Sequence, residues 1–137
     1  MGGRGSKSGG MGGGRGSQAK YNDSNNVRRF LQDQLDQYGL GISKNELADK
    51  IYTAAKMDGM DVTILNSKYL TVKNENGSAD FSFTKSTKDG KWILTPMLEY
   101  GEVTRGRHNG YTMYKVGPHW FSNKTNAEWS AVANKLG

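Results

Sequence analysis

Apolar residues recur at helical spacing in the first half of the chain. The apolar residues between Val27 and Tyr38 are spaced three or four positions apart, which predicts a helix of about 14 residues that ends at Gly39. A second helix begins at Ser43, because Ser43 and Glu46 have the spacing of a capping box, and Gly59 is placed to end it. We expect these helices to form a helical hairpin. Their buried faces are Val27, Phe30, Leu31, Leu35 and Tyr38, and then Leu47, Ile51, Tyr52, Ala54 and Ala55.

After Gly59 the pattern changes to the alternation that is typical of strands with one buried face. Four short runs show it, and residues that favour tight turns separate them, including an Asn-Gly pair at 76–77 and an Asp-Gly pair at 89–90. Consecutive strands joined by short turns predict an antiparallel meander. The four runs are centred on Val62–Ile64, Leu70–Val72, Phe81–Phe83 and Trp92–Leu94.

The last third of the chain predicts one more strand and one more helix. Residues 98–109 are polar and irregular, Tyr111–Val116 predicts a fifth strand that ends at Gly117-Pro118, and Thr125 with Glu128 forms a second capping box. The fold class is therefore α+β, with an N-terminal helical hairpin, a four- or five-stranded antiparallel meander and a C-terminal helix packed on the sheet. The apolar face of the last helix is Trp129, Val132, Ala133 and Leu136.

The chain divides into a basic tail and one domain. Nine of its 19 glycines fall in the first 16 residues, and residues 1–20 contain four basic side chains and no acid. Such a segment cannot bury enough apolar surface to offset the entropy lost on ordering, so we expect residues 1–20 to be disordered and 21–137 to form a single domain. The expected core is Leu31, Leu35, Leu47, Ile51, Val62, Ile64, Leu70, Phe81, Phe83, Trp92, Leu94, Trp129 and Val132.

The sequence lacks the residues that several classes of function require. The 137-residue chain has no cysteine, which excludes disulfides, thiolate catalysis and Cys-ligated metals. It contains neither a metal-ligand motif nor a nucleotide-binding motif, so we expect no cofactor and no metal. Because it has no long apolar run and no signal peptide, we expect a cytoplasmic protein that does not contact membranes.

Basic and aromatic residues are interleaved between Val103 and Lys124, where no acid occurs. Basic groups contact phosphates and aromatic rings stack on bases, a combination that favours single-stranded nucleic acid or a nucleoprotein. The alternative is that Trp120 and Phe121 fill the core and the basic residues are a solvated rim. The predicted binding residues are Arg4, Lys7, Arg15 and Lys20 in the tail, and Arg105, Arg107, Tyr111, Tyr114, Lys115, Trp120 and Lys124 in this stretch.

His108 and His119 lie in the same stretch and suggest a ribonuclease as the enzymatic alternative. One imidazole would take the proton of the 2′-hydroxyl and the other would protonate the leaving oxygen. This chemistry requires the two side chains to converge, and nothing in their spacing requires it. We therefore expect a protein without catalytic activity.

The sequence Gly-Gly-Arg-Gly-Ser occurs at residues 2–6 and again at 13–17. This opening resembles the starts of small accessory proteins of phages and prophages of Gram-positive bacteria. The resemblance covers 17 of the 137 residues. It implies a phage protein in the host cell that accompanies nucleic acid. It also leaves open a structural protein, or an inhibitor of a host defence nuclease such as a CRISPR effector, that acts by contact with another protein.

Overall fold

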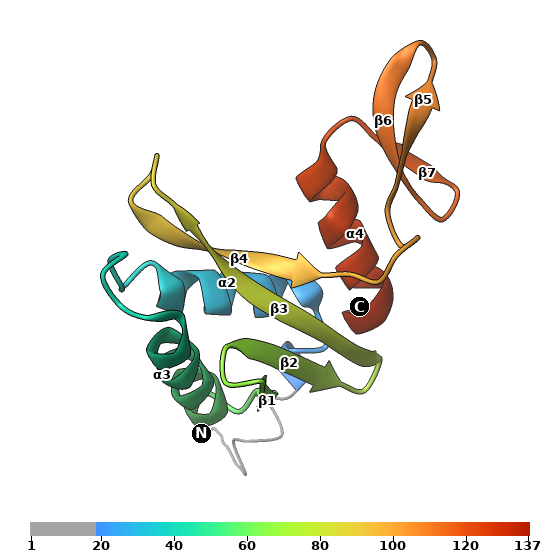
Figure 1. Ribbon diagram of the computed structural model, residues 1–137. Helices are drawn as coiled ribbons and strands as arrows, with labels where there is room; N and C mark the ends of the chain where they lie inside the picture. The colour runs from blue at the N-terminus through green and yellow to red at the C-terminus, as the bar shows by residue number, and fades with distance from the viewer. Residues whose placement is uncertain (1–18) are drawn as a thin grey trace, which may run out of the picture.

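A computed structural model describes residues 19–137. Disorder is expected of residues 1–20, of which 1–18 lie outside the described residues, whereas Ala19 and Lys20 have helical backbone. Within the described residues, α2 and α3 come first along the chain, strands β1 to β7 follow, and α4 comes last (Figure 1). They are α2 (Ser24–Leu35), α3 (Lys44–Met57), β1 (Asp61–Leu65), β2 (Tyr69–Asn74), β3 (Gly77–Ser86), β4 (Lys91–Met97), β5 (Thr104–His108), β6 (Tyr111–Val116), β7 (His119–Phe121) and α4 (Lys124–Leu136).

The helices begin and end where side chains satisfy free backbone groups. Asp23 caps α2 by accepting a hydrogen bond from the amide of Asn25, and Ser43 caps α3 by accepting one from Glu46, as predicted. Gly59 follows α3 with a φ of +89°, also as predicted. Helix α2 ends at Leu35, earlier than its apolar pattern indicated, and a turn leads on to Gly39.

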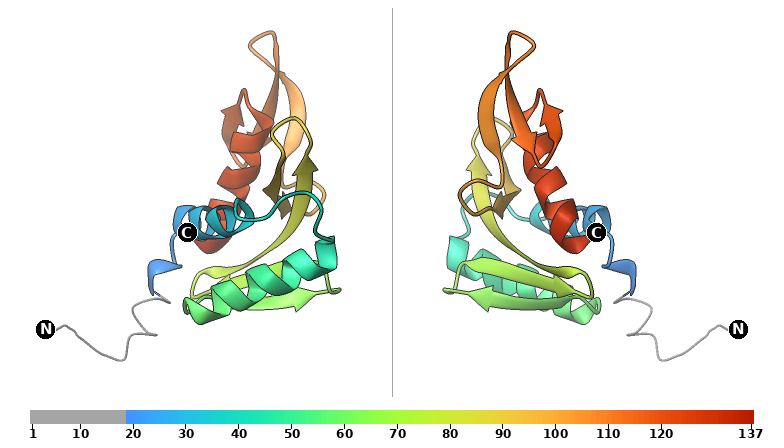
Figure 2. Two further views of the ribbon diagram at one scale, coloured as in Figure 1. Left: turned by 90° about the vertical axis from the view of Figure 1, so that its left-hand side faces the viewer. Right: turned by 90° about the vertical axis from the view of Figure 1, so that its right-hand side faces the viewer.

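Strands β1 to β4 form an antiparallel meander in sequence order, here called the main sheet. Its register pairs Val62 with Val72, and Leu70 with Phe81, so the apolar residues share one face. Helices α2 and α3 cover that face (Figures 1 and 2). The α+β class is confirmed, and every residue of the expected core is buried except Ile64, which is partly buried.

Strands β5, β6 and β7 form a second antiparallel sheet, here called the small sheet. The predicted fifth strand exists as β6 and ends before Gly117-Pro118, but it pairs within the small sheet and not with β4. The prediction that residues 98–109 are irregular is wrong for Thr104–His108. This strand has no apolar residue to reveal it, and it is held in place by the two-residue turn Asn109-Gly110, whose φ angles are +54° and +83°.

Helix α4 packs against both sheets. The Trp129 ring stacks on Phe81 of β3 with 5.7 Å between centroids, while Ala127 and Ala131 pack with Val116 of β6. The predicted capping box at Thr125 is wrong, because Asn123 accepts the hydrogen bond from the amide of Asn126 and the helix starts two residues earlier. Ala133 is exposed, contrary to expectation, because the buried face of α4 runs through Ala127, Ala131 and Val132 instead.

Candidate nucleic-acid interface

The small sheet stands out from the rest of the domain. Figures 1 and 2 show hairpin β5–β6 extending beyond the N-terminal end of α4, away from the main sheet. Strand β7 pairs only with Tyr114–Val116. Beyond it, Gly106–His108 and Tyr111–Met113 form a two-stranded ribbon closed by Asn109-Gly110, here called the tip ribbon.

This sheet accounts for the positive charge of the described domain. Residues 19–137 contain 16 lysines and arginines against 13 acids, a net charge of +3. Residues 103–124 contribute +4 to this total, because they hold Arg105, Arg107, Lys115 and Lys124 and no acid, so the remaining described residues have a net charge of −1. Three of these four cations lie on the small sheet, and Lys124 is the first residue of α4. The positive charge is therefore concentrated on the part of the domain that protrudes.

One face of the small sheet, here called the helix-side face, packs against α4 at its base. Tyr114, Val116 and Phe121 lie there beside Ala127 and Ala131. Arg105 pairs with Tyr114 and therefore shares this face, as does Arg107 two residues further along. The Arg107 guanidinium donates a hydrogen bond of 2.7 Å to the carbonyl oxygen of Gly110, which holds it at the tip.

The opposite face, here called the outer face, is built around Trp120. The His108 ring stacks on the indole with 4.6 Å between centroids and 10° between planes, and Lys115 Nζ lies 5.6 Å from the indole centroid. Lys115 is directly opposite Trp120 in the register, whereas His108 lies nearer the tip and the indole edge reaches over Gly106 between them. The indole therefore has two close neighbours on this face, His108 and Lys115.

Glycine at position 106 makes room for this arrangement. A Cβ there would lie 3.4 Å from Cη2 of Trp120, so a methyl group would just touch the indole and a longer side chain would displace it. Sequence reasoning missed this residue, because Gly106 between two arginines suggests only a flexible loop. The Asn109-Gly110 pair, which favours a type I′ hairpin turn, is the signal that would have revealed β5.

The two histidines do not converge. His119 pairs with Val116 at the base of the sheet and lies on the helix-side face, whereas His108 pairs with Tyr111 at the tip and lies on the outer face. The structure thus separates the acid and base that the ribonuclease alternative needs. It also divides the other predicted residues, with Phe121 packed toward α4 and Trp120 on the outer face.

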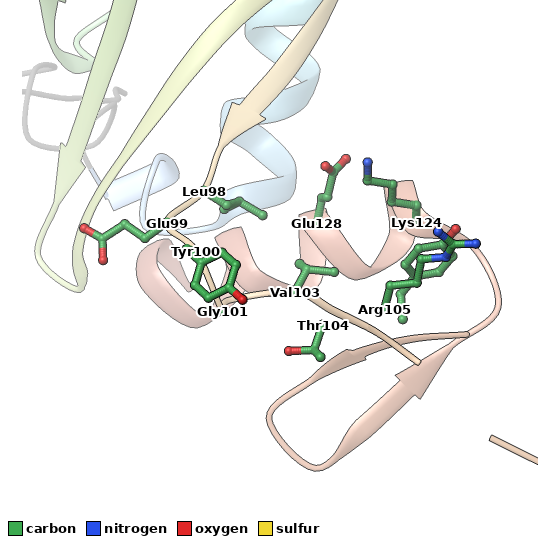
Figure 3. A pocket seen from close by; sticks show the side chains of 10 residues that line it. Leu98, Glu99, Tyr100, Gly101, Val103, Thr104, Arg105, Lys124 and Glu128 are labelled. Atoms are coloured by element: carbon green, nitrogen blue, oxygen red, sulfur yellow. The ribbon is translucent and has the colours of Figure 1, made fainter. Parts of the chain in front are cut away.

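A cavity of about 610 Å³ lies between α4 and the segment that joins the two sheets (Figure 3). Arg105 and Lys124 line one end, and Glu99 and Tyr100 line the other. Glu128 adds a second carboxylate, so the walls carry both signs of charge. This cavity places Lys124 near Arg105 but does not continue the purely basic surface of the tip.

The tail residues take no part in this arrangement. Arg4, Lys7 and Arg15 lie outside the described residues, and Lys20 contacts the end of α3, a helix that Figure 1 shows far from the small sheet. Lys20 Nζ is 3.1 Å from a carboxylate oxygen of Asp58, and the Tyr21 hydroxyl donates a hydrogen bond to the same carboxylate.

Burial, together with Asp58, raises the pKa of Tyr21 well above its ordinary value. The hydrogen bond from Tyr21 lowers the pKa of Asp58, and Lys20 lowers it further.

The described part of the chain contains neither a candidate metal site nor a candidate membrane-spanning helix. No three His, Asp or Glu side chains among residues 19–137 gather to hold a metal ion. None of the helices there is long and apolar enough to span a membrane. Comparison of the chain with protein-family models, curated proteins and solved structures gave no match, so the relation to phage accessory proteins stays a prediction.

Proposed function

We propose that this protein binds nucleic acid without catalysing a reaction, and that the small sheet is its main contact surface. The observation that carries the proposal is the separation of charge, with +4 on residues 103–124 and −1 on the remaining described residues. Phosphates are attracted to such a surface whatever the base sequence. The basic residues of the tail, Arg4, Lys7 and Arg15, add further contacts.

The arrangement of the small sheet supports the proposal in two ways. Arg105, Arg107 and Lys115 are exposed, and none of them has a carboxylate partner within residues 19–137. Antiparallel pairing and two short turns fix the positions of their backbones, so little backbone entropy is lost when phosphates bind. A solvated rim of unrelated charges would include acids, as the rest of the domain does.

Binding to labelled DNA and RNA, measured by fluorescence anisotropy across a salt series, tests the proposal. We expect affinity that falls with salt, and a double variant Arg105→Glu and Arg107→Glu that binds much more weakly. The matched control is Lys50→Glu with Lys88→Glu, which changes the net charge equally at exposed lysines on α3 and on the β3–β4 turn.

Two outcomes would count against the proposal. Equal losses in the two double variants would mean that net charge matters and the small sheet does not. A lack of binding to any nucleic acid at low salt would leave contact with another protein, as an inhibitor or a structural component, as the function to test next by copurification. Cleaved substrate after the assay would contradict the absence of catalysis.

A further inference from the structure

We infer that the nucleic acid is B-form duplex DNA and that the tip ribbon enters its major groove. This inference rests on the proposed function and adds to it the class of ligand and the manner of binding. Four features of the small sheet carry it, namely the dimensions of the ribbon, the presence of basic side chains on both faces of the β5–β6 hairpin, the stacking of His108 on Trp120 and the side chains at the turn.

The tip ribbon has the dimensions of an element that fits a groove. Three pairs of residues, from Gly106–Met113 to His108–Tyr111, extend beyond β7, and at about 3.3 Å per residue they project roughly 10 Å before the turn. The major groove of B-DNA is about 12 Å wide and about 8.5 Å deep and admits a two-stranded ribbon. The two-residue turn keeps the end of the ribbon narrow.

Basic side chains extend from both faces of the hairpin. Arg105 and Arg107 lie on the helix-side face, and Lys115 lies on the outer face with the imidazole of His108. A protein that binds along one flat surface presents its cations on one face only. Arg105 and Lys115 lie at the base of the tip ribbon, so insertion of the ribbon brings these two cations, one on each face, to the phosphates along the two rims of the groove.

The aromatic residues argue against a single-strand platform. Unpaired bases stack on free ring faces, but the His108 imidazole already stacks on the Trp120 indole, and Lys115 Nζ lies 5.6 Å from the indole centroid. Tyr111, which is 72% exposed at the tip, is the large side chain left open on this sheet. One exposed ring at the end of a ribbon contacts the floor or wall of a groove better than it holds a run of stacked bases.

The chemistry at the tip also fits the edges of base pairs. The hydrogen bond from Arg107 to the carbonyl of Gly110 fixes a guanidinium beside the turn, and Asn109 lies in the turn itself. Arginine and asparagine are side chains that pair with guanine and adenine in the major groove. The A-form groove of duplex RNA is too deep and narrow for such contacts, so duplex DNA is favoured over duplex RNA.

The test compares a 20-base-pair DNA duplex, its separate strands and the RNA duplex of the same sequence, using the full chain and anisotropy. We expect the DNA duplex to bind most tightly. Methyl green, which occupies the major groove, should compete, whereas netropsin, which occupies the minor groove, should not. Arg107→Ala should weaken binding about fivefold or more, and Lys115→Ala should reduce the slope of log affinity against log salt by about one unit. Lys50→Ala on α3 is the control and should change neither.

The outcomes separate this inference from the proposed function. Tighter binding of single strands or of duplex RNA, or competition by netropsin alone, would overturn the groove assignment and leave nucleic-acid binding intact. So would a Lys115→Ala variant that behaves like Lys50→Ala, because then only one face is used. Failure to bind any of the three ligands would remove both. Thermal unfolding of each variant, matched to the parent chain, shows that reduced affinity does not come from a disrupted fold.

Discussion

The imidazole of His108 and the indole of Trp120 lie face to face on the outer face of the small sheet, with ring centroids 4.6 Å apart. The two residues belong to different edge strands, β5 and β7, and the indole reaches across the central strand to Gly106. This contact therefore joins the two edges of a three-stranded sheet that has little other apolar packing on that face. His108 packs on Trp120 and lies on the opposite face from His119.

The stacked pair leads to a prediction about stability. Trp120→Ala removes the stacking interaction, worth about 0.5–1.5 kcal/mol, and the area that the indole buries, so it should lower the free energy of unfolding by about 1–3 kcal/mol. Tyr111→Ala on the same face should change it by less than about 0.5 kcal/mol, because Tyr111 is 72% exposed. Urea denaturation of both variants measures the difference, and equal effects would contradict the role given to Trp120.

The edge of the main sheet at β4 is closed by a side chain. The amide of Gln32 on α2 donates to the carbonyl oxygen of Trp92 at 2.8 Å and accepts from the amide of Leu94 at 2.9 Å, as a neighbouring strand would. Gln32→Ala should lower the free energy of unfolding by roughly 1–3 kcal/mol because it removes both hydrogen bonds to β4, and should expose an edge that pairs with other chains.

Denaturation and light scattering after gel filtration measure these two effects of Gln32→Ala. Gln37→Ala is the control, because Gln37 is exposed and its side-chain bond is to Gln34 within the same turn. A Gln32→Ala chain that is as stable and as monomeric as the Gln37→Ala chain would show that the edge needs no protection.

The contact between Tyr21 and Asp58 predicts a dependence of stability on pH in two ranges. The pKa of Asp58 is lowered on folding by its hydrogen bond from Tyr21, so its contribution is present above the ordinary carboxyl pKa of 3.8 and is lost as the pH falls below it. The pKa of Tyr21 is raised by burial and by Asp58, so its contribution is present below the ordinary phenol pKa of 10.0 and is lost as the pH rises above it.

Tyr21→Phe separates these effects. It removes the group that titrates at high pH and the hydrogen bond that lowers the pKa of Asp58. The variant should therefore lose less stability than the parent chain between about pH 9 and 11, and also less between about pH 5 and 3. Denaturant titrations at these four pH values check this, and parallel curves for the two chains would contradict it.

The tail is predicted to be dispensable for folding and useful for binding. All core residues lie between Tyr21 and Leu136, so a chain that lacks residues 1–18 should unfold cooperatively at the same denaturant concentration as the full chain. Its affinity for nucleic acid should fall, because Arg4, Lys7 and Arg15 are removed. Loss of cooperative unfolding would place the domain boundary elsewhere, and unchanged affinity would leave the tail without a part in binding.

The sequence predicts the main sheet well because its apolar residues alternate and its turns carry Asn-Gly and Asp-Gly. The same reasoning fails at β5, because Thr-Arg-Gly-Arg-His has no apolar residue and its stability comes from pairing with β6. A strand of this kind depends on its neighbour and on a turn, and neither leaves a hydrophobic pattern in the strand itself.

The candidate site was predictable in composition but not in arrangement. The absence of acids between Val103 and Lys124 is visible in the sequence, and the interleaved aromatic residues suggested a surface for stacking. Which residues share a face depends on the register. That register puts Arg105 and Arg107 on one face of the small sheet, and Lys115 and Trp120 on the other. This register could not be predicted, because β5 leaves no hydrophobic pattern in the sequence.

The central claim is that the small sheet binds nucleic acid through its own charges. The most direct measurement is the slope of log affinity against log salt for a DNA duplex, compared between Arg105→Ala with Lys115→Ala and the control Lys50→Ala with Lys88→Ala. If the claim holds, the first pair reduces the magnitude of the slope by about two units, since each phosphate that the protein neutralises contributes about 0.9, and the control leaves the slope unchanged. Equal slopes in the two variants, or a duplex that does not bind at low salt, would contradict the claim.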